Sequence, residues 1–228
     1  MNVVWTDDLT PYRTRKVRIL NGAHTASVLA AFHTGLNTVR EMVEDSVFGP
    51  FVRRVIFDEI LPTVPLPEQE KTAYAEAVLE RFRNPFIHHD LLSIALNSVS
   101  KWKVRVLPSL LDYLHARGSL PPLLSFSLAA LFHFYRVQRR GQDELSGLRG
   151  SDAYPIHDEP AVLDFFAECR AELESHGDLR RFAAKVLRNE QLWGMDLNRV
   201  TGLAGTVTNA LEQIGKAGMR RAVEEMVK

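Results

Sequence analysis

Residues 118–135 read GSLPPLLSFSLAALFHFY, a stretch with no formal charge when its histidine is neutral. Such a stretch approaches the length that can span a membrane. However, a pair of prolines stands near its start, two serines interrupt its apolar surface, and arginines follow at positions 136, 139 and 140. Helices that are apolar all round also occur at the centre of large globular domains. We therefore expect a buried core helix here and no membrane span.

The rest of the chain has the spacing of helices that pack around such a core. Apolar residues recur mostly at three- and four-residue intervals, and few segments alternate as strands do. The expected helices cover residues 12–34, 37–47, 49–61, 67–83, 86–97, 108–115, 122–140, 160–175 and 178–189, with one or two more near the carboxy terminus. Residues 142–158 are rich in Gly, Ser and Asp, which predicts a long loop. The predicted architecture is all-α, without an internal repeat or a clear domain boundary.

The composition is that of an ordinary globular protein. The chain has 228 residues, of which 46% are apolar and 25% charged, and its formal net charge is zero. Nucleic-acid binders usually carry a basic excess, so we expect no nucleic-acid partner. Cys169 is the only cysteine, which excludes an intrachain disulfide, and the first residues lack the pattern of a signal peptide. These features predict a cytoplasmic protein with no membrane partner.

The first expected helix carries three polar residues with a suggestive spacing. Residues 16–24 read KVRILNGAH, which is K-x4-N-x2-H filled by Lys16, Asn21 and His24. At about 100° per residue of an α-helix, His24 lies about 80° and Asn21 about 140° from Lys16. We therefore expect the three side chains to share one face.

These three residue types suit the reduction of a carbonyl group. A lysine can donate the proton that the carbonyl oxygen needs, provided that burial or nearby cations lower its pKa. An asparagine amide can stabilise negative charge on that oxygen, and a histidine can hold a neighbouring hydroxyl group. A lysine, an asparagine and a histidine also share a helical face by chance, so spacing alone leaves both interpretations open.

The surroundings of this face favour a function. Arg13, Arg15 and Arg18 crowd the amino-terminal end of the helix together with Lys16. Cations there oppose the helix dipole and one another, which predicts a bound anion and a lowered pKa for Lys16. Small residues from Gly22 to Ala31 make the rest of the helix thin, so that another element or a ligand can approach closely.

K-x4-N-x2-H resembles the signature of the polyol-specific long-chain dehydrogenases, the mannitol dehydrogenase family. Within it, residues 5–25 (WTDDLTPYRTRKVRILNGAHT) are most similar to members that act on sugar acids. Further matches are RNPFI at 83–87, SVSK at 98–101, VLPSL at 106–110 and WG at 193–194. The resemblance covers the whole chain but only the carboxy-terminal half of the family. It implies that residues 1–228 form one helical domain, the substrate-binding and catalytic domain.

The resemblance also implies roles for individual residues. Lys16 would be the catalytic acid and base, Asn21 part of the oxyanion site and His24 a substrate contact. Lys101 stands where many members carry a substrate-binding arginine, and a lysine there would bind as a point charge rather than bidentately. The implied reaction is the reversible reduction of D-tagaturonate to D-altronate by NADH. The anionic substrate would suit Arg13, Arg15 and Arg18, with the carboxylate contact open among them.

The nucleotide-binding half of such an enzyme is missing from the sequence. No G-x-G-x-x-G follows an expected strand, although a dinucleotide-binding domain needs those glycines. We therefore expect NAD to be bound mainly by a separate amino-terminal Rossmann half, and the chain alone to be inactive. A helical interaction or assembly module that kept the fold without turnover is the alternative, as is a fragment of a fructuronate or mannitol-type dehydrogenase.

Other candidate residues favour structural roles. His88 and His89 are adjacent, so their side chains diverge by about 100° on a helix and do not share a metal ion. We expect no metal cofactor. Cys169 follows two phenylalanines, which predicts a packed thiol, and Trp102 and Trp193 are expected in the core or at an interface.

Overall fold

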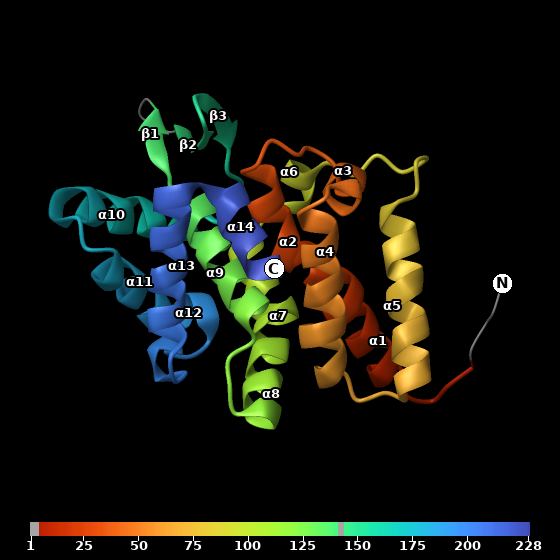
Figure 1. Ribbon diagram of the computed structural model, residues 1–228. Helices are drawn as coiled ribbons and strands as arrows, with labels where there is room; N and C mark the ends of the chain where they lie inside the picture. Colours follow the sequence, from red (N-terminus) through yellow and green to blue (C-terminus); the bar gives the residue numbers. More distant parts are fainter. Residues whose placement is uncertain (1–4, 141–143) are drawn as a thin grey trace.

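The uncharged stretch forms helix α9 (Pro122–Phe134), around which the other elements pack. The computed structural model describes residues 5–140 and 144–228. Figure 1 shows α9 between α13 (Leu203–Ala217) and α2 (Ala23–Phe32), and it contacts both helices. All its residues are buried except Pro122 at its start, which is exposed, and His133, which is half-buried. The prediction of a core helix is confirmed, and none of the described helices is long and apolar enough to cross a membrane.

The predicted all-α architecture is confirmed. The amino-terminal helices are α1 (Thr10–Arg15), the π-helix η1 (Lys16–Gly22), α2, α3 (Val39–Glu44), α4 (Phe48–Arg54), the π-helix η2 (Val55–Ile60), the 3-10 turn η3 (Leu61–Thr63), α5 (Glu68–Phe82), α6 (Leu91–Ile94), α7 (Ser98–Arg105) and α8 (Leu107–Arg117). The carboxy-terminal helices are α10 (Pro160–His176), α11 (Leu179–Arg188), α12 (Glu190–Trp193), the 3-10 turn η4 (Leu197–Arg199), α13 and α14 (Met219–Val227).

A small antiparallel sheet lies where a loop was expected. It consists of β1 (Gln138–Arg140), β2 (Glu144–Arg149) and β3 (Asp152–Pro155), in that order. Gly147 pairs with Tyr154, and a Cβ atom at Gly147 would lie 2.2 Å from the tyrosine ring, so the glycine makes room for that ring. The loop prediction is therefore wrong over residues 144–155, where the two strands and their turn form, and correct over 156–158, whereas residues 142 and 143 lie outside the described part. The predicted helix over 122–140 ends earlier, at Phe134.

The segment before α8 also differs from the sequence-based expectation. The helix expected over 86–97 is only the single turn α6, and α7 forms in a stretch where no helix was predicted. Asn97, whose φ of 51° is left-handed, separates the two helices and turns the chain into α7. This turn places Lys101 and Arg105 on one helix, four residues apart.

The core contains both tryptophans that the sequence predicts in the core or at an interface. The rings of Trp102 and Trp193 meet edge to face, with their centroids 5.8 Å apart, and both side chains are fully buried. The indole of Trp102 donates to the Ser127 hydroxyl on α9, and that of Trp193 donates to the Val186 carbonyl. Cys169 is also buried, and burial raises the pKa of its thiol to about 11. The prediction that these three residues belong to the core is confirmed.

Candidate active site

The predicted catalytic face lies on one continuous helix that changes its geometry in the middle. It runs through α1, η1 and α2, from Thr10 to Phe32, and the π-helical part is Lys16–Gly22. The α-helical angles expected from the sequence therefore do not hold here. In a π-helix the hydrogen bonds join residues five apart, so Asn21 lies about one turn after Lys16 and closer to its side of the helix than the 140° of an α-helix. Short π-helical turns occur frequently at functional sites.

The small residues of this helix allow a close approach, as predicted. A Cβ atom at Gly22 would lie 3.1 Å from the carbonyl oxygen of Arg105 and 3.6 Å from Cδ1 of Ile60. Gly22 thus brings the carboxy-terminal end of α7 directly against the π-helical turn. The crossing places the Arg105 side chain beside the helix that carries the three candidate residues.

His24 is held as a neutral ring. It stacks on Phe82 with ring centroids 4.0 Å apart and an interplanar angle of 15°, and the His89 ring lies edge-on at 6.4 Å. Burial first, and then the charges of His89 and Arg105, lower the pKa of His24 to about 3. Its Nε2 atom is buried and has no hydrogen-bond partner among the described residues. A buried polar atom without a hydrogen-bond partner is costly in free energy.

The other two candidates are more open. The side chain of Lys16 is exposed and that of Asn21 is half-buried. The Thr25 hydroxyl donates to the Asn21 carbonyl oxygen at 2.9 Å. None of the hydrogen bonds within the described residues joins the side chains of Lys16, Asn21 and His24 to one another.

The cations at the start of the helix are compensated, contrary to expectation. Arg15 Nη1 donates to Glu70 at 2.7 Å, and its guanidinium lies 4.3 Å from the centroid of the Tyr74 ring. Arg18 forms an ion pair with Asp112 and donates to the Thr63 carbonyl at 3.0 Å. Acidic residues that follow far along the chain supply the balancing charge, which no local pattern revealed. Arg13 is exposed. The substrate-binding roles of Arg13, Arg15 and Arg18 stay predictions.

Lys101 and Arg105 add two cations from α7. Lys101 Nζ donates to the Ile94 carbonyl at 2.9 Å, and burial followed by the charge of Arg105 lowers the lysine pKa, while Asp158 raises it. Arg105 is half-buried, and its one hydrogen bond in the described structure is a long one of 3.5 Å to the Thr25 hydroxyl. Sequence reasoning missed Arg105 because it missed α7. Its spacing of four residues from Lys101 is the signal that would have found it.

The described residues fit neither a dinucleotide nor a metal ion. In residues 5–140 and 144–228 the one sheet is antiparallel, whereas a dinucleotide-binding domain is built on parallel strands with a glycine-rich turn. The same part of the chain contains no group of three His, Cys, Asp or Glu side chains that could hold a metal ion. His88 instead pairs with Asp90 at 2.9 Å.

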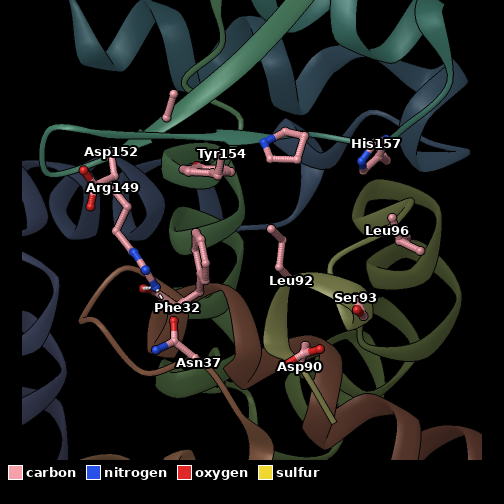
Figure 2. Close-up of a pocket in the computed structure, with 12 residues that line it drawn as sticks. Phe32, Asn37, Asp90, Leu92, Ser93, Leu96, Arg149, Asp152, Tyr154 and His157 are labelled. Carbon is pink, nitrogen blue, oxygen red and sulfur yellow. Dashed lines mark hydrogen bonds between the residues drawn. The ribbon is translucent and has the colours of Figure 1, made fainter.

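A cavity of about 530 Å³ lies away from this helix face, between α6 and β3 (Figure 2). Arg149 reaches across one end of it, where its Nη1 donates to Asn37 Oδ1 at 2.9 Å and its guanidinium lies over the Phe32 ring. Asp90 lines the cavity, whereas the preceding His89 faces His24. Lys16, Asn21 and His24 do not line it, so the cavity is separate from the candidate active site.

Sequence similarity places this helical domain in a family of dehydrogenases. Residues 8–215 match the family model described as the mannitol dehydrogenase C-terminal domain, and the chain belongs to that family. It is 46% identical over 225 residues to an altronate oxidoreductase of Pectobacterium atrosepticum, covering 98% of this chain and 45% of that protein. It is 45% identical over 218 residues to an altronate oxidoreductase of Bacillus subtilis, covering 96% of this chain and 42% of that protein. The chain thus spans less than half the length of these relatives.

Solved structures of polyol dehydrogenases share the fold. The mannitol 2-dehydrogenase of Pseudomonas fluorescens, solved as a ternary complex with NAD and D-mannitol, superposes with a TM-score of 0.82 at 21% identity, covering 100% of this chain and 43% of that one. A substrate-free D-sorbitol dehydrogenase superposes with a TM-score of 0.73 at 19% identity, covering 96% and 41%. At these identities the likeness concerns the fold alone.

Proposed function

We propose that residues 1–228 act as the catalytic and substrate-binding domain of an NAD-dependent oxidoreductase that interconverts D-tagaturonate and D-altronate. The curated relatives at about 45% identity, which are named altronate oxidoreductase, support this choice of substrate. A nucleotide-binding half, from a separate polypeptide or a longer form of this one, completes the enzyme. The nicotinamide cofactor held by that half supplies the hydride.

In the direction of reduction, the ketone oxygen of the substrate gains negative charge and then a proton. The Lys16 ammonium group donates that proton to the oxygen, and the Asn21 amide donates a hydrogen bond to it. His24 binds a neighbouring hydroxyl group as a neutral ring. Because Lys16 is exposed in this chain, the nucleotide-binding half and the substrate have to cover it and exclude water from the reacting oxygen.

The observation that carries the proposal is the state of His24. Its ring is fixed against Phe82 and kept neutral by burial, and its Nε2 atom is buried without a partner in the described structure. A histidine that served only to fill the core would be expected to satisfy its ring nitrogens within the fold. A substrate hydroxyl group beside the π-helical turn satisfies Nε2.

The test is the oxidation of NADH in the presence of D-tagaturonate. We expect no turnover by the chain alone and turnover after addition of the nucleotide-binding half of a relative. Replacement of the proton donor in Lys16→Ala should then lower kcat by about 10²- to 10⁴-fold. The matched control is Lys216→Ala, an exposed lysine on α13, which should leave kcat unchanged.

Each part of the proposal can fail separately. Turnover by the chain alone would overturn the need for a second half. Unchanged kcat in Lys16→Ala would overturn the assigned proton donor. A preference for D-fructuronate or D-mannitol over D-tagaturonate would overturn the substrate, and complete inactivity of the assembled halves would favour a module that kept the fold without turnover.

A further inference from the structure

We propose that Arg105 binds the carboxylate of the substrate and makes the site select sugar acids over neutral polyols. The inference rests on the proposed function, since it concerns the substrate of the same site. It differs from the sequence-based expectation that Arg13, Arg15 or Arg18 binds the carboxylate, because Arg15 and Arg18 already pair with Glu70 and Asp112 and Arg13 is exposed.

Arg105 lies beside the helix that carries the candidate residues. The carbonyl oxygen of Arg105 lies against Gly22, and its guanidinium reaches the Thr25 hydroxyl, which itself donates to the Asn21 carbonyl oxygen. The charge of Arg105 also reaches the neighbouring His24, as the lowered pKa of that ring indicates. The guanidinium therefore lies beside the part of the helix that runs from Asn21 to His24.

The guanidinium of Arg105 has no anionic partner among the described residues. Among the described residues no carboxylate pairs with Arg105, and a half-buried charge without a partner is unfavourable. Lys101, one turn earlier on α7, adds a like charge on the same face, which is unfavourable as well. The dipole of α7 accounts for a cation in the last turn of the helix but not for its half-buried position over the catalytic helix. A bound anion removes both penalties.

The guanidinium group of Arg105 suits a carboxylate better than a hydroxyl group. A guanidinium presents a planar fork of donors that matches the two oxygens of a carboxylate, and Lys101 can add a point charge nearby. A neutral polyol offers hydroxyl groups only and leaves the charge of Arg105 uncompensated. Arg105 therefore contributes binding energy to a sugar acid that it does not contribute to a polyol of the same length.

The test is calorimetric titration of the 228-residue chain with D-altronate and with D-altritol, which carries a neutral CH₂OH group in place of the carboxylate. In Arg105→Gln we expect the association constant for D-altronate to fall at least about tenfold, with no change for D-altritol. Arg105→Lys keeps the charge but loses the fork, so its affinity should be intermediate. The matched control is Lys103→Gln, which removes a cation from the opposite side of α7 and should bind like the wild type.

The outcomes separate this inference from the proposed function. Unchanged D-altronate binding in Arg105→Gln, or an equal loss for both ligands, would overturn the role of Arg105 and leave the substrate standing. An equal loss in Lys103→Gln would show a general effect of net charge and would also overturn it. No binding of D-altronate by the wild-type chain would overturn this inference, whereas the substrate class is decided by the turnover of D-tagaturonate by the assembled halves.

Discussion

At the scale of single residues, buried Glu59 and three buried histidines have opposite effects on the pH dependence of stability. Glu59 in η2 is 2% exposed and accepts the backbone N–H groups of Leu123 and Leu124 at 2.8 and 2.7 Å, at the start of α9. Burial raises the pKa of Glu59 from 4.5 to about 7. Burial, with neighbouring charges, lowers the pKa of His24 to about 3 and those of His33 and His133 to about 4 and about 3.

The free energy of unfolding changes with pH because folded and unfolded chains bind different numbers of protons. Between pH 4.5 and 7 folded Glu59 keeps a proton that the unfolded chain has lost, so its contribution to the free energy of unfolding falls as the pH rises. The three histidines lack a proton when folded that the unfolded chain binds below pH 6.5, so their contribution rises with pH. The two effects partly cancel in the wild type.

Glu59→Gln should therefore make the pH dependence of stability steeper. A glutamine does not titrate, so the free energy of unfolding should rise more steeply between pH 4.5 and 7, by up to about 1.4 kcal/mol per pH unit. Urea unfolding at a series of pH values measures the slope. Glu80→Gln, at an exposed position on α5, is the control, and parallel curves for Glu59→Gln and the wild type would contradict the assignment.

At the scale of elements, the two π-helical turns form one structural unit. η1 and η2 contact each other, and Ile60 of η2 reaches the place where a Cβ atom of Gly22 would be. The first turn carries Lys16 and Asn21, and the second carries Glu59, which fixes the start of α9. The helix of the candidate residues, from Thr10 to Phe32, is thereby joined to the core through the two places where the regular α-helical pattern is interrupted.

Gly22→Val tests this packing. The added methyl groups would meet the Arg105 carbonyl oxygen and Ile60, and such crowding typically costs about 1–3 kcal/mol. The matched control is Gly215→Val in α13, where no atom lies within 4 Å of the added Cβ. Chemical denaturation should show a clearly lower free energy of unfolding for Gly22→Val than for Gly215→Val, and equal losses would contradict a close crossing at Gly22.

The sequence predicts elements best where local signals are complete. Helix α5, with an early proline and two acids in its first turn, was expected over 67–83 and runs over Glu68–Phe82. The π-helical turns were not foreseen, since residue propensities do not encode an extra residue in a turn. A glycine-rich composition predicts a loop over 142–158, whereas Gly147 makes room for the Tyr154 ring on the paired strand, and composition does not reveal this fit. The pairing of Arg15 with Glu70 and the approach of Arg105 to Thr25 depend on contacts between segments far apart in the sequence, which no local pattern encodes.

At the scale of the whole molecule, α9 joins the two ends of the chain in one core. It contacts α2, which carries His24, and α13 from the carboxy-terminal region, and Figure 1 shows it between them. Phe132 of α9 lies 6.2 Å from Trp193, ring centroid to centroid, and Trp102 bonds to Ser127 of the same helix. Because the buried apolar residues of the described part form one cluster, the helix from Thr10 to Phe32 depends for its stability on helices far along the chain.

Leu128→Ala in the middle of α9 should therefore destabilise both ends of the chain equally. Leu128 is fully buried, and removing its side chain should cost about 2–5 kcal/mol, whereas Val104→Ala at a position 61% exposed should stay within about 0.5 kcal/mol of the wild type. Native-state hydrogen exchange of the amides in α2 and α13 measures the two ends separately. If the core is shared, the most protected amides of both helices lose the same free energy of opening, because they exchange through the same global unfolding. A loss confined to α13 would mean that α2 opens independently of the core. Under the proposed function, the nucleotide-binding half would then have to stabilise α2 before Lys16 and His24 could act together.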